Sequence, residues 1–325
     1  MRKIIILSLV TALTFYTCKK DDTGTKSSSI NNLEITSIVI DKSNIRWVGT
    51  ENGLYKSVDT SYVFEEVTKN AKVLSLGYKA SENLLWVGTV ESLYKGSITS
   101  DNLTVETIDL TNLSNKTINA AYVDSSLKSW FGTNIGITMN KVGKFKKSEF
   151  GNDGTESRKL DLESYKINSI ASWDGDYYFA TSGAAIYRAY GYNNNVDGFT
   201  GASVYGPPYN GDAISDTMFV VFVDSKGRQW MGGTAGIQSN TGHESKNHDN
   251  LLYFYDELPN YRVHAVAEAP DGKIWVGTEA GISIYDGTNW TTKKTSLSSN
   301  FITAIAFDKN GSAWIGTKKG IVNLK

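Results

Sequence analysis

Short apolar segments and polar turns alternate along the chain in a unit that recurs seven times. Each unit starts with an apolar segment, passes through a polar turn and reaches an aromatic residue that is followed by small residues. Another turn, a third apolar segment and a weaker fourth complete the unit. Short segments of this kind between turn residues are typical of β-strands, and no useful window of the repeating region has the 3.6-residue period of an amphipathic helix. The pattern predicts four antiparallel strands per unit.

The aromatic residue belongs to near copies of the string Trp-Val-Gly-Thr. A wide ring buries roughly 150–250 Å² when it is wedged between two sheets, and a glycine beside it lets the sheets approach closely. We therefore expect Trp86 and Trp275 to be buried between neighbouring sheets. Successive copies lie 39 to 52 residues apart, with Tyr178 in the place of tryptophan in the fourth copy and the others at Trp47, Trp86, Trp130, Trp230, Trp275 and Trp314.

Each copy is preceded by a turn signal. Asn or Gly lies three residues before the aromatic residue, where a tight hairpin demands positive φ, in every copy except the third, which has Leu127 there. Four copies also have an aspartate six residues before the aromatic residue, where its side chain can accept hydrogen bonds from the amides of its own turn: Asp41, Asp124, Asp224 and Asp308.

Four strands in about 44 residues describe one blade of a β-propeller. The sequence predicts an all-β, seven-bladed β-propeller over residues 33–325, with four antiparallel strands per blade. Residues 301–325 supply only three strands, so the last blade is either incomplete or closed by the segment Lys26–Asn32. The expected blades lie near 33–72, 73–117, 118–166, 167–217, 218–262, 263–300 and 301–325.

The repeated string resembles the two-component regulator propeller repeat. The resemblance rests on the inner apolar segment, the Asp-x-x-Gly-x-x-Trp-Val-Gly-Thr core and the following Gly-Leu or Gly-Ile, and it covers residues 33–325. In Bacteroidetes this repeat builds periplasmic sensors of hybrid histidine kinases, so the resemblance implies a sensor-like propeller. Those sensors commonly have two propellers followed by an Ig-like module, a transmembrane helix and a kinase. This sequence has one propeller, and signalling by this chain alone is not implied.

The N-terminus indicates export. Arg2 and Lys3 precede a short apolar run that ends at Cys18, the single cysteine. The segment resembles a lipoprotein signal of Bacteroidetes, which predicts a signal peptide over residues 1–17, lipidation of Cys18 and a tether over residues 18–32. Lys19-Lys20-Asp21-Asp22 resembles the tag that directs such lipoproteins to the outer face of the outer membrane. The alternatives are a periplasmic or an ordinary secreted protein with an incidental cysteine.

Composition narrows the classes of function. With 33 Lys and Arg against 34 Asp and Glu, the net charge of −1 gives no electrostatic reason to expect a nucleic-acid partner. One cysteine excludes a disulfide framework within the chain. No nucleophile elbow, phosphate-binding loop or dinucleotide fingerprint is present, and we expect no cofactor and a monomer.

Candidate binding residues fall in two places. The fourth unit is the longest and rich in Tyr and Asn, which suit a sugar or a peptide, so Trp173, Tyr205 and Tyr209 are candidates; the alternative is a covering loop. His264 lies in a predicted inner strand and is either a ligand-binding group or a polar lining of the channel. His243 to Asp249 form a polar loop with two His and two acids, which we interpret as a solvated loop rather than a metal site.

Two classes of function follow. The first is a membrane-anchored binding or sensor-like module that takes a glycan or a partner protein. The second is a secreted lyase or hydrolase of polysaccharide, because propellers also support catalysis. Acidic residues and a histidine converging at the channel mouth would favour the enzyme, whereas aromatic residues without a titratable cluster would favour binding. The sequence shows the aromatic residues and a single inner-strand histidine, and it favours binding.

Overall fold

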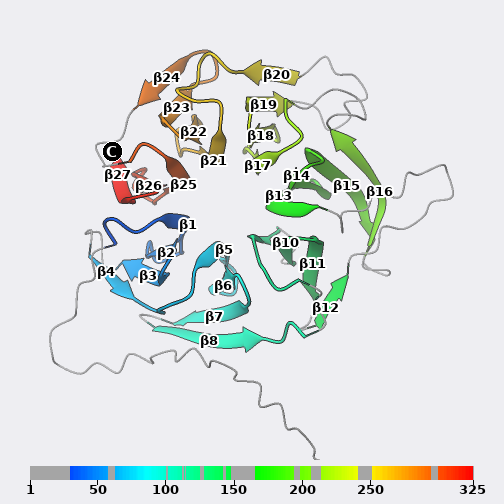
Figure 1. Ribbon diagram of the computed structural model, residues 1–325, viewed down its shortest axis with the longest axis vertical. Helices are drawn as coiled ribbons and strands as arrows, with labels where there is room; N and C mark the ends of the chain where they lie inside the picture. The colour runs from blue at the N-terminus through cyan, green and yellow to red at the C-terminus, as the bar shows by residue number, and fades with distance from the viewer. Residues whose placement is uncertain are drawn as a thin grey trace, which may run out of the picture.

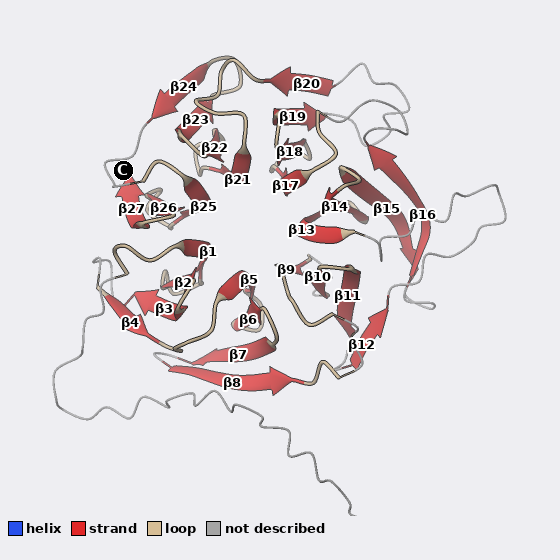
Figure 2. Cartoon of the chain, viewed as in Figure 1, coloured by secondary structure: helices blue, strands red, loops and turns tan. Residues whose placement is uncertain are grey.

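In a computed structural model, the chain forms a ring of seven antiparallel sheets around a central channel (Figure 1). The structure describes residues 30–57, 63–99, 102–111, 113, 115–124, 128–141, 144–147, 165–193, 198–205, 214–240, 251–293 and 299–324. Strands and connecting loops make up all of this described part, with no helix in it (Figure 2). The expected seven-bladed β-propeller is confirmed.

Each blade has its first strand at the channel and its later strands progressively farther out (Figure 1). The innermost strands are β1 (Ile35–Ile40), β5 (Val73–Lys79), β9 (Ala120–Val123), β13 (Lys166–Trp173), β17 (Met218–Val223), β21 (Val263–Glu268) and β25 (Ile302–Phe307). The second strands, which contain the repeated aromatic residue, are β2 (Arg46–Thr50), β6 (Leu84–Thr89), β10 (Ser129–Thr133), β14 (Asp176–Ser182), β18 (Gln229–Gly233), β22 (Ile274–Thr278) and β26 (Ala313–Thr317).

The third and fourth strands complete the blades. The third strands are β3 (Gly53–Ser57), β7 (Leu93–Thr99), β11 (Gly136–Lys141), β15 (Ile186–Asn193), β19 (Gly236–Asn240), β23 (Gly281–Tyr285) and β27 (Gly320–Leu324). The outermost strands are β4 (Phe64–Glu66), β8 (Asn102–Ile108), β12 (Lys144–Lys147), β16 (Gly198–Tyr205), β20 (Leu251–Phe254) and β24 (Trp290–Lys293). Among the described residues, the seventh blade has three strands.

The repeated tryptophans hold neighbouring blades together. Trp86 is 3% exposed and Trp275 is 9% exposed. The Trp86 ring meets Phe131 of the next blade edge to face, with ring centroids 5.0 Å apart, and Trp275 meets Phe307 in the same way at 5.3 Å. The core is therefore divided among the seams between blades, where these rings pack against the next blade.

Each turn aspartate fixes both its own turn and the tryptophan. Asp41 Oδ1 accepts hydrogen bonds from the amides of Ser43 and Ile45, at 2.8 and 2.9 Å, as the sequence predicts. Its other oxygen accepts the indole N–H of Trp47 at 3.0 Å, a contact that the sequence analysis missed. The same bond from the indole joins Asp124 to Trp130, Asp224 to Trp230 and Asp308 to Trp314.

The expected positive φ occurs at every Asn or Gly turn position. These residues have φ between 51° and 84°; they are Asn44, Asn83, Gly175, Gly227, Gly272 and Gly311. The exception in the third copy, Leu127, lies outside the described residues.

The ring closes without a shared strand among the described residues. Ile30 to Leu33 form a turn rather than a fourth strand for blade seven, so strand pairing of this segment is wrong as far as it is described; residues 26–29 lie outside that part. Ile30 is 2% exposed and packs in a cluster with Trp314 and Ile321. The amide of Gly320 donates to the carbonyl of Leu33 at 2.8 Å. Within the part of the chain that the structure describes, the last blade is incomplete, as one of the two expected arrangements has it.

Candidate functional site

In six of the seven inner strands, one residue near the start is displaced from the ladder of hydrogen bonds. In β1, for example, Ile35 pairs with Thr50 but Ser37 pairs with Gly49, so Thr36 is skipped as at a β-bulge. Such shifts redirect a side chain, and they occur next to functional sites. The same shift occurs in β5, β13, β17, β21 and β25, where it skips Leu74, Asn168, Phe219, His264 and Thr303.

All of these skipped residues line one cavity, at the end of the channel where the inner strands begin. Asn119, just before β9, occupies the equivalent place in blade three, and its amide donates to the carbonyl of Gly132. The cavity has a volume of about 320 Å³ and is also lined by Glu34, Lys72, Lys166, Phe301 and Lys318. We call this cavity the channel mouth. The turns that follow the second strands reach the same end, since Lys318 belongs to one of them.

Three rings form an aromatic wall on one side of the channel mouth. His264 lies between Phe219 and Phe301: its ring is nearly parallel to Phe219 at 4.6 Å between centroids and tilted to Phe301 at 4.8 Å. A cation covers each outer ring, with Arg262 5.2 Å from the centroid of Phe219 and Lys318 5.2 Å from that of Phe301. Cations over aromatic faces are held electrostatically, and the wall is therefore ordered from both ends.

Glu279 fixes the histidine of this wall. Its Oε1 lies 3.0 Å from His264 Nε2 and 2.6 Å from Arg262 Nε. A carboxylate only accepts hydrogen bonds, so Nε2 carries the proton and donates it. Burial lowers the pKa of His264, despite the opposing effect of Glu279. For Glu279, burial favours a higher pKa, but the hydrogen bonds from His264 and Arg262 outweigh it and the pKa is lowered.

The rest of the channel mouth is polar and carries lysines. Glu34 accepts from Lys318 at 2.5 Å and lies 3.6 Å from Lys72. The side-chain amide of Asn119 donates to Asn134 at 2.9 Å, and that of Asn168 donates to the carbonyl of Met218 at 2.7 Å. These bonds orient the two amides, so their positions do not depend on a ligand.

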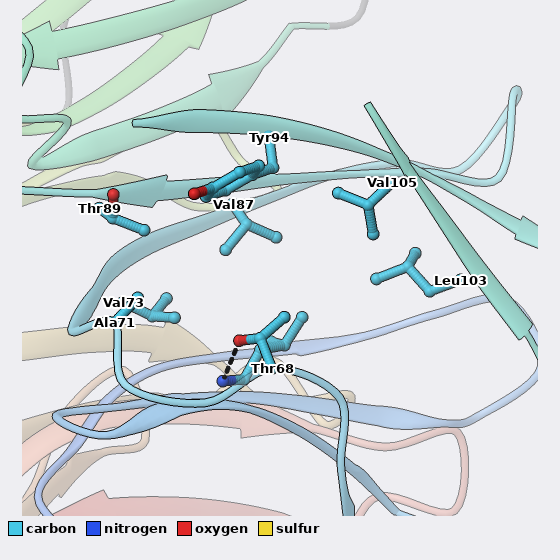
Figure 3. A pocket seen from close by; sticks show the side chains of 9 residues that line it. Thr68, Ala71, Val73, Val87, Thr89, Tyr94, Leu103 and Val105 are labelled. Atoms are coloured by element: carbon cyan, nitrogen blue, oxygen red, sulfur yellow. Dashed lines mark hydrogen bonds between the residues drawn. The ribbon is translucent and has the colours of Figure 1, made fainter. Parts of the chain in front are cut away.

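A second cavity lies between blades one and two and is a packing void. It measures about 10 Å³ and is lined mainly by apolar side chains, among them Val73, Val87 and Leu103 (Figure 3). The nearby Thr68 hydroxyl is already used, because it accepts the amide of Leu54 at 3.1 Å. A space of this size holds at most about one water molecule and needs polar partners to do so. This void offers no ligand site.

The structure does not bring the sequence-predicted site residues together. His264 lines the channel mouth, but Trp173 ends β13 about five residues beyond Asn168, roughly 16 Å farther along the strand. There Trp173 packs against Gly227, at the opposite end of the channel. Tyr205 ends the outermost strand of blade four, at the rim, where its backbone pairs with Ile186; its side chain is not described.

The other candidates lie outside the described residues. They are Cys18, Tyr209 and the loop from His243 to Asp249. Within the described part of the chain, no group of three or more His, Cys, Asp or Glu side chains is placed to hold a metal ion.

The sequence analysis missed most of the channel mouth. Phe219, Phe301 and Glu279 belong to different blades, and no local motif joins them. A usable signal existed in the repeat itself: the residue that follows the first buried residue of each inner strand varies from copy to copy, whereas the buried residue is always apolar.

The architecture defines this protein as a seven-bladed β-propeller. Residues 257–280 and 296–319 match the model of the two-component regulator propeller. These two segments therefore carry repeats of the two-component regulator propeller family, which confirms the resemblance noted in the repeated string. A comparison with curated protein sequences finds no match.

Solved structures share the fold at low sequence identity. Streptogramin B lyase is 17% identical, with a TM-score of 0.71 over 92% of this chain and 95% of that chain. The WD40 β-propeller domain of Doa1 is 15% identical, with a TM-score of 0.66 over 90% and 93% of the two chains. An extracellular domain from B. thetaiotaomicron named for a hybrid two-component system is 13% identical, with a TM-score of 0.47; the alignment covers 90% of this chain and 50% of that one. At these identities the likeness is one of fold alone.

A search of the described residues for a helix long and apolar enough to cross a membrane finds none.

Proposed function

We propose that the chain is an extracytoplasmic, sensor-like binding module that holds a glycan or a segment of a partner protein at the channel mouth. The observation that carries this proposal is the ring formed by the displaced residues and Asn119, because it presents aromatic, amide and hydroxyl groups from six blades, and Leu74 from blade two, to one cavity. A cavity of about 320 Å³ lies at the lower end of the range for small-molecule sites.

The proposed location is the outer membrane, with the propeller on the cell surface and anchored through Cys18; a periplasmic or secreted protein is the alternative. Support comes from the N-terminal sequence and from the repeat family. Lipid alone would hold the protein to the membrane. We propose that it acts as a monomer.

The test is a glycan array and a pull-down with the purified full-length protein, followed by affinity measurements on variants. Phe219→Ala with Phe301→Ala removes two rings of the aromatic wall. Tyr205→Ala with Tyr209→Ala removes the candidates in blade four. Loss of binding only in the first pair supports the channel mouth, and loss only in the second moves the site to the rim. Equal binding by wild type and both pairs would contradict both locations.

A second function is favoured by one observation. The condition set for an enzyme is that acidic residues and a histidine converge at the channel mouth, and it is met in part: His264 lines the mouth and one acid, Glu279, bonds to it. A neutral imidazole can accept a proton at Nδ1 while Nε2 donates to the carboxylate. A lyase or hydrolase would release new double bonds or new reducing ends from a polysaccharide, and His264→Phe and Glu279→Gln would abolish the release. Binding without turnover would leave the first proposal in place.

A further inference from the structure

The channel mouth is more positive than the chain as a whole. Lys72, Lys166 and Lys318 line it against the single carboxylate of Glu34, so its formal charge is 3 − 1 = +2 with His264 neutral. The complete chain has a formal charge of −1. A concave site with a surplus of one sign concentrates ligands of the opposite sign.

The internal ion pairs leave this surplus in place. The Glu34 carboxylate forms ion pairs with two ammonium groups, at 2.5 Å from Lys318 and 3.6 Å from Lys72. One negative charge is thus shared by two positive charges. Lys166 is exposed and makes no ion pair with any described residue. A further carboxylate supplied by a ligand would therefore meet ammonium groups that the protein itself does not neutralise.

Lys318 covers Phe301 of the aromatic wall, whereas the other two lysines lie on a different part of the ring. Lys72 and Lys166 directly precede the first buried residues of β5 and β13, on either side of Asn119. The central ring of the wall, His264, belongs to β21, which lies across the channel from β5 (Figure 1). The ring faces of the wall are covered by one another, by Arg262 and by Lys318. A ligand that fills the cavity thus meets the apolar ring edges of the wall on one side and two lysines with an amide on the other.

Building on the proposed function, we propose that the channel mouth binds a carboxylate-bearing saccharide of the uronic acid class. A sugar ring offers an apolar C–H face for the aromatic wall, hydroxyl groups for Asn119 and Asn168, and a carboxylate for Lys72 and Lys166. Ammonium–carboxylate contacts are among the stronger hydrogen bonds in proteins. A neutral sugar would leave the lysines unused.

An acidic peptide fits these observations less well. Stable protein interfaces bury about 800 Å² on each partner, which requires a broad surface rather than a cavity at a channel mouth. An extended peptide also loses the conformational freedom of many bonds when it binds, whereas a sugar ring is rigid before binding.

Calorimetric titration of the purified full-length protein tests the proposal. The probes are digalacturonate and its methyl ester, which differ in charge and little in shape. The acid should bind at least tenfold more tightly than the ester, and added salt should weaken the acid only. Lys166→Gln should weaken acid binding about tenfold and leave the melting temperature and any ester binding unchanged.

The control is Lys226→Gln, which makes the same change of charge in the β17–β18 turn at the opposite end of the channel. It should bind the acid like wild type. Equal affinity for acid and ester, or preference for a polyglutamate peptide, would overturn the uronic acid proposal and leave the binding function intact. If no saccharide and no protein partner binds at the channel mouth, both proposals fail.

Discussion

Gly316 of the last blade and Ile35 of the first meet across the seam that closes the ring. A methyl group on Gly316 would lie 2.6 Å from Ile35 Cγ2, closer than side chains approach. The glycine of every other Trp-x-Gly string faces the next blade in the same way, with contacts to that blade of 2.4 to 2.7 Å; these pairs are Gly49 with Val73, Gly88 with Ile118, Gly132 with Ile167, Gly232 with Val263, and Gly277 with Ile302. The closing seam is therefore built like the others.

Gly316→Ala should destabilise the protein by about 1–3 kcal/mol, because the added methyl group overpacks the seam. In blade four, the chain itself has an alanine at the glycine position: Ala180 packs in a cluster with Met218 of the next blade. Met218 is unbranched and flexible, so it leaves room for the methyl group. Thermal and denaturant unfolding of the purified protein provide the measurement.

A double-mutant cycle with Ile35→Ala identifies the contact responsible. Since Ile35 Cγ2 is the nearest atom, Gly316→Ala should cost clearly less when Ile35 is already Ala. An unchanged cost in that background would show that another contact keeps position 316 as glycine.

Asp308→Ala should cost about 2 kcal/mol, because it leaves the buried indole N–H of Trp314 without its acceptor at 3.1 Å. It also removes the acceptor for the amides of Asn310 and Ser312. Equilibrium unfolding in urea gives the measurement.

The sixth blade offers the reverse experiment. Ala269 occupies the place of the aspartate, and its turn has the same backbone hydrogen bonds as that of Asp308. Ala269→Asp should place a carboxylate near the indole of Trp275 and raise stability by about 1 kcal/mol. A neutral or destabilising outcome would mean that the aspartate stabilises its turn only in its native surroundings.

The repeat predicts the fold well because a blade is specified locally. The turn at Asn44, the indole of Trp47 and the small residue Gly49 act within one unit or on its neighbour, and each unit carries its own copy. Closure was harder to predict, because two arrangements of the N-terminal segment satisfied the pattern. The packing of Ile30 beside Trp314 joins residues from opposite ends of the chain, which no local motif records.

The site was predicted poorly for a physical reason. Phe219, His264 and Phe301 come from three blades, and their stacking depends on the angle between neighbouring sheets. Composition drew attention to Tyr205, whose backbone lies at the rim. His264 was recognised because it is a polar residue in a predicted inner strand beside the channel, whereas phenylalanine in such a strand resembles ordinary core.

Acidification should lower the stability of the folded protein because of His264. Its pKa in the folded protein lies below the ordinary value of 6.5, chiefly because of burial, so the unfolded chain binds the proton more readily. The stabilising contribution is complete above about pH 6.5 and declines as the pH falls below it. His264→Phe keeps a ring between Phe219 and Phe301 but cannot titrate. Between pH 5 and 7.5, the free energy of unfolding should change less with pH in the variant than in wild type. Equal pH dependence in both proteins would contradict the lowered pKa of His264.

Cys18→Ser should release the protein from membranes. With the cysteine acylated, wild type partitions into the detergent phase, and the variant moves to the aqueous phase because it loses the proposed lipid anchor. Ser28→Ala, in the tether, is the control and should behave like wild type. Recovery of wild type in the aqueous phase with an unmodified mature N-terminus would show that Cys18 carries no lipid.

The skipped residues of the inner strands have a consequence for how such a protein can change. Because Thr36, Asn168 and His264 stand outside the ladder, replacing one of them breaks none of the register that holds its blade. Neighbouring positions such as Ile35, at 0% exposure, have no such freedom. Ligand preference can therefore diversify at one position per blade while the scaffold stays constant. A library randomised at the six skipped residues and at Asn119 would explore new specificities while the strand register of each blade stays intact.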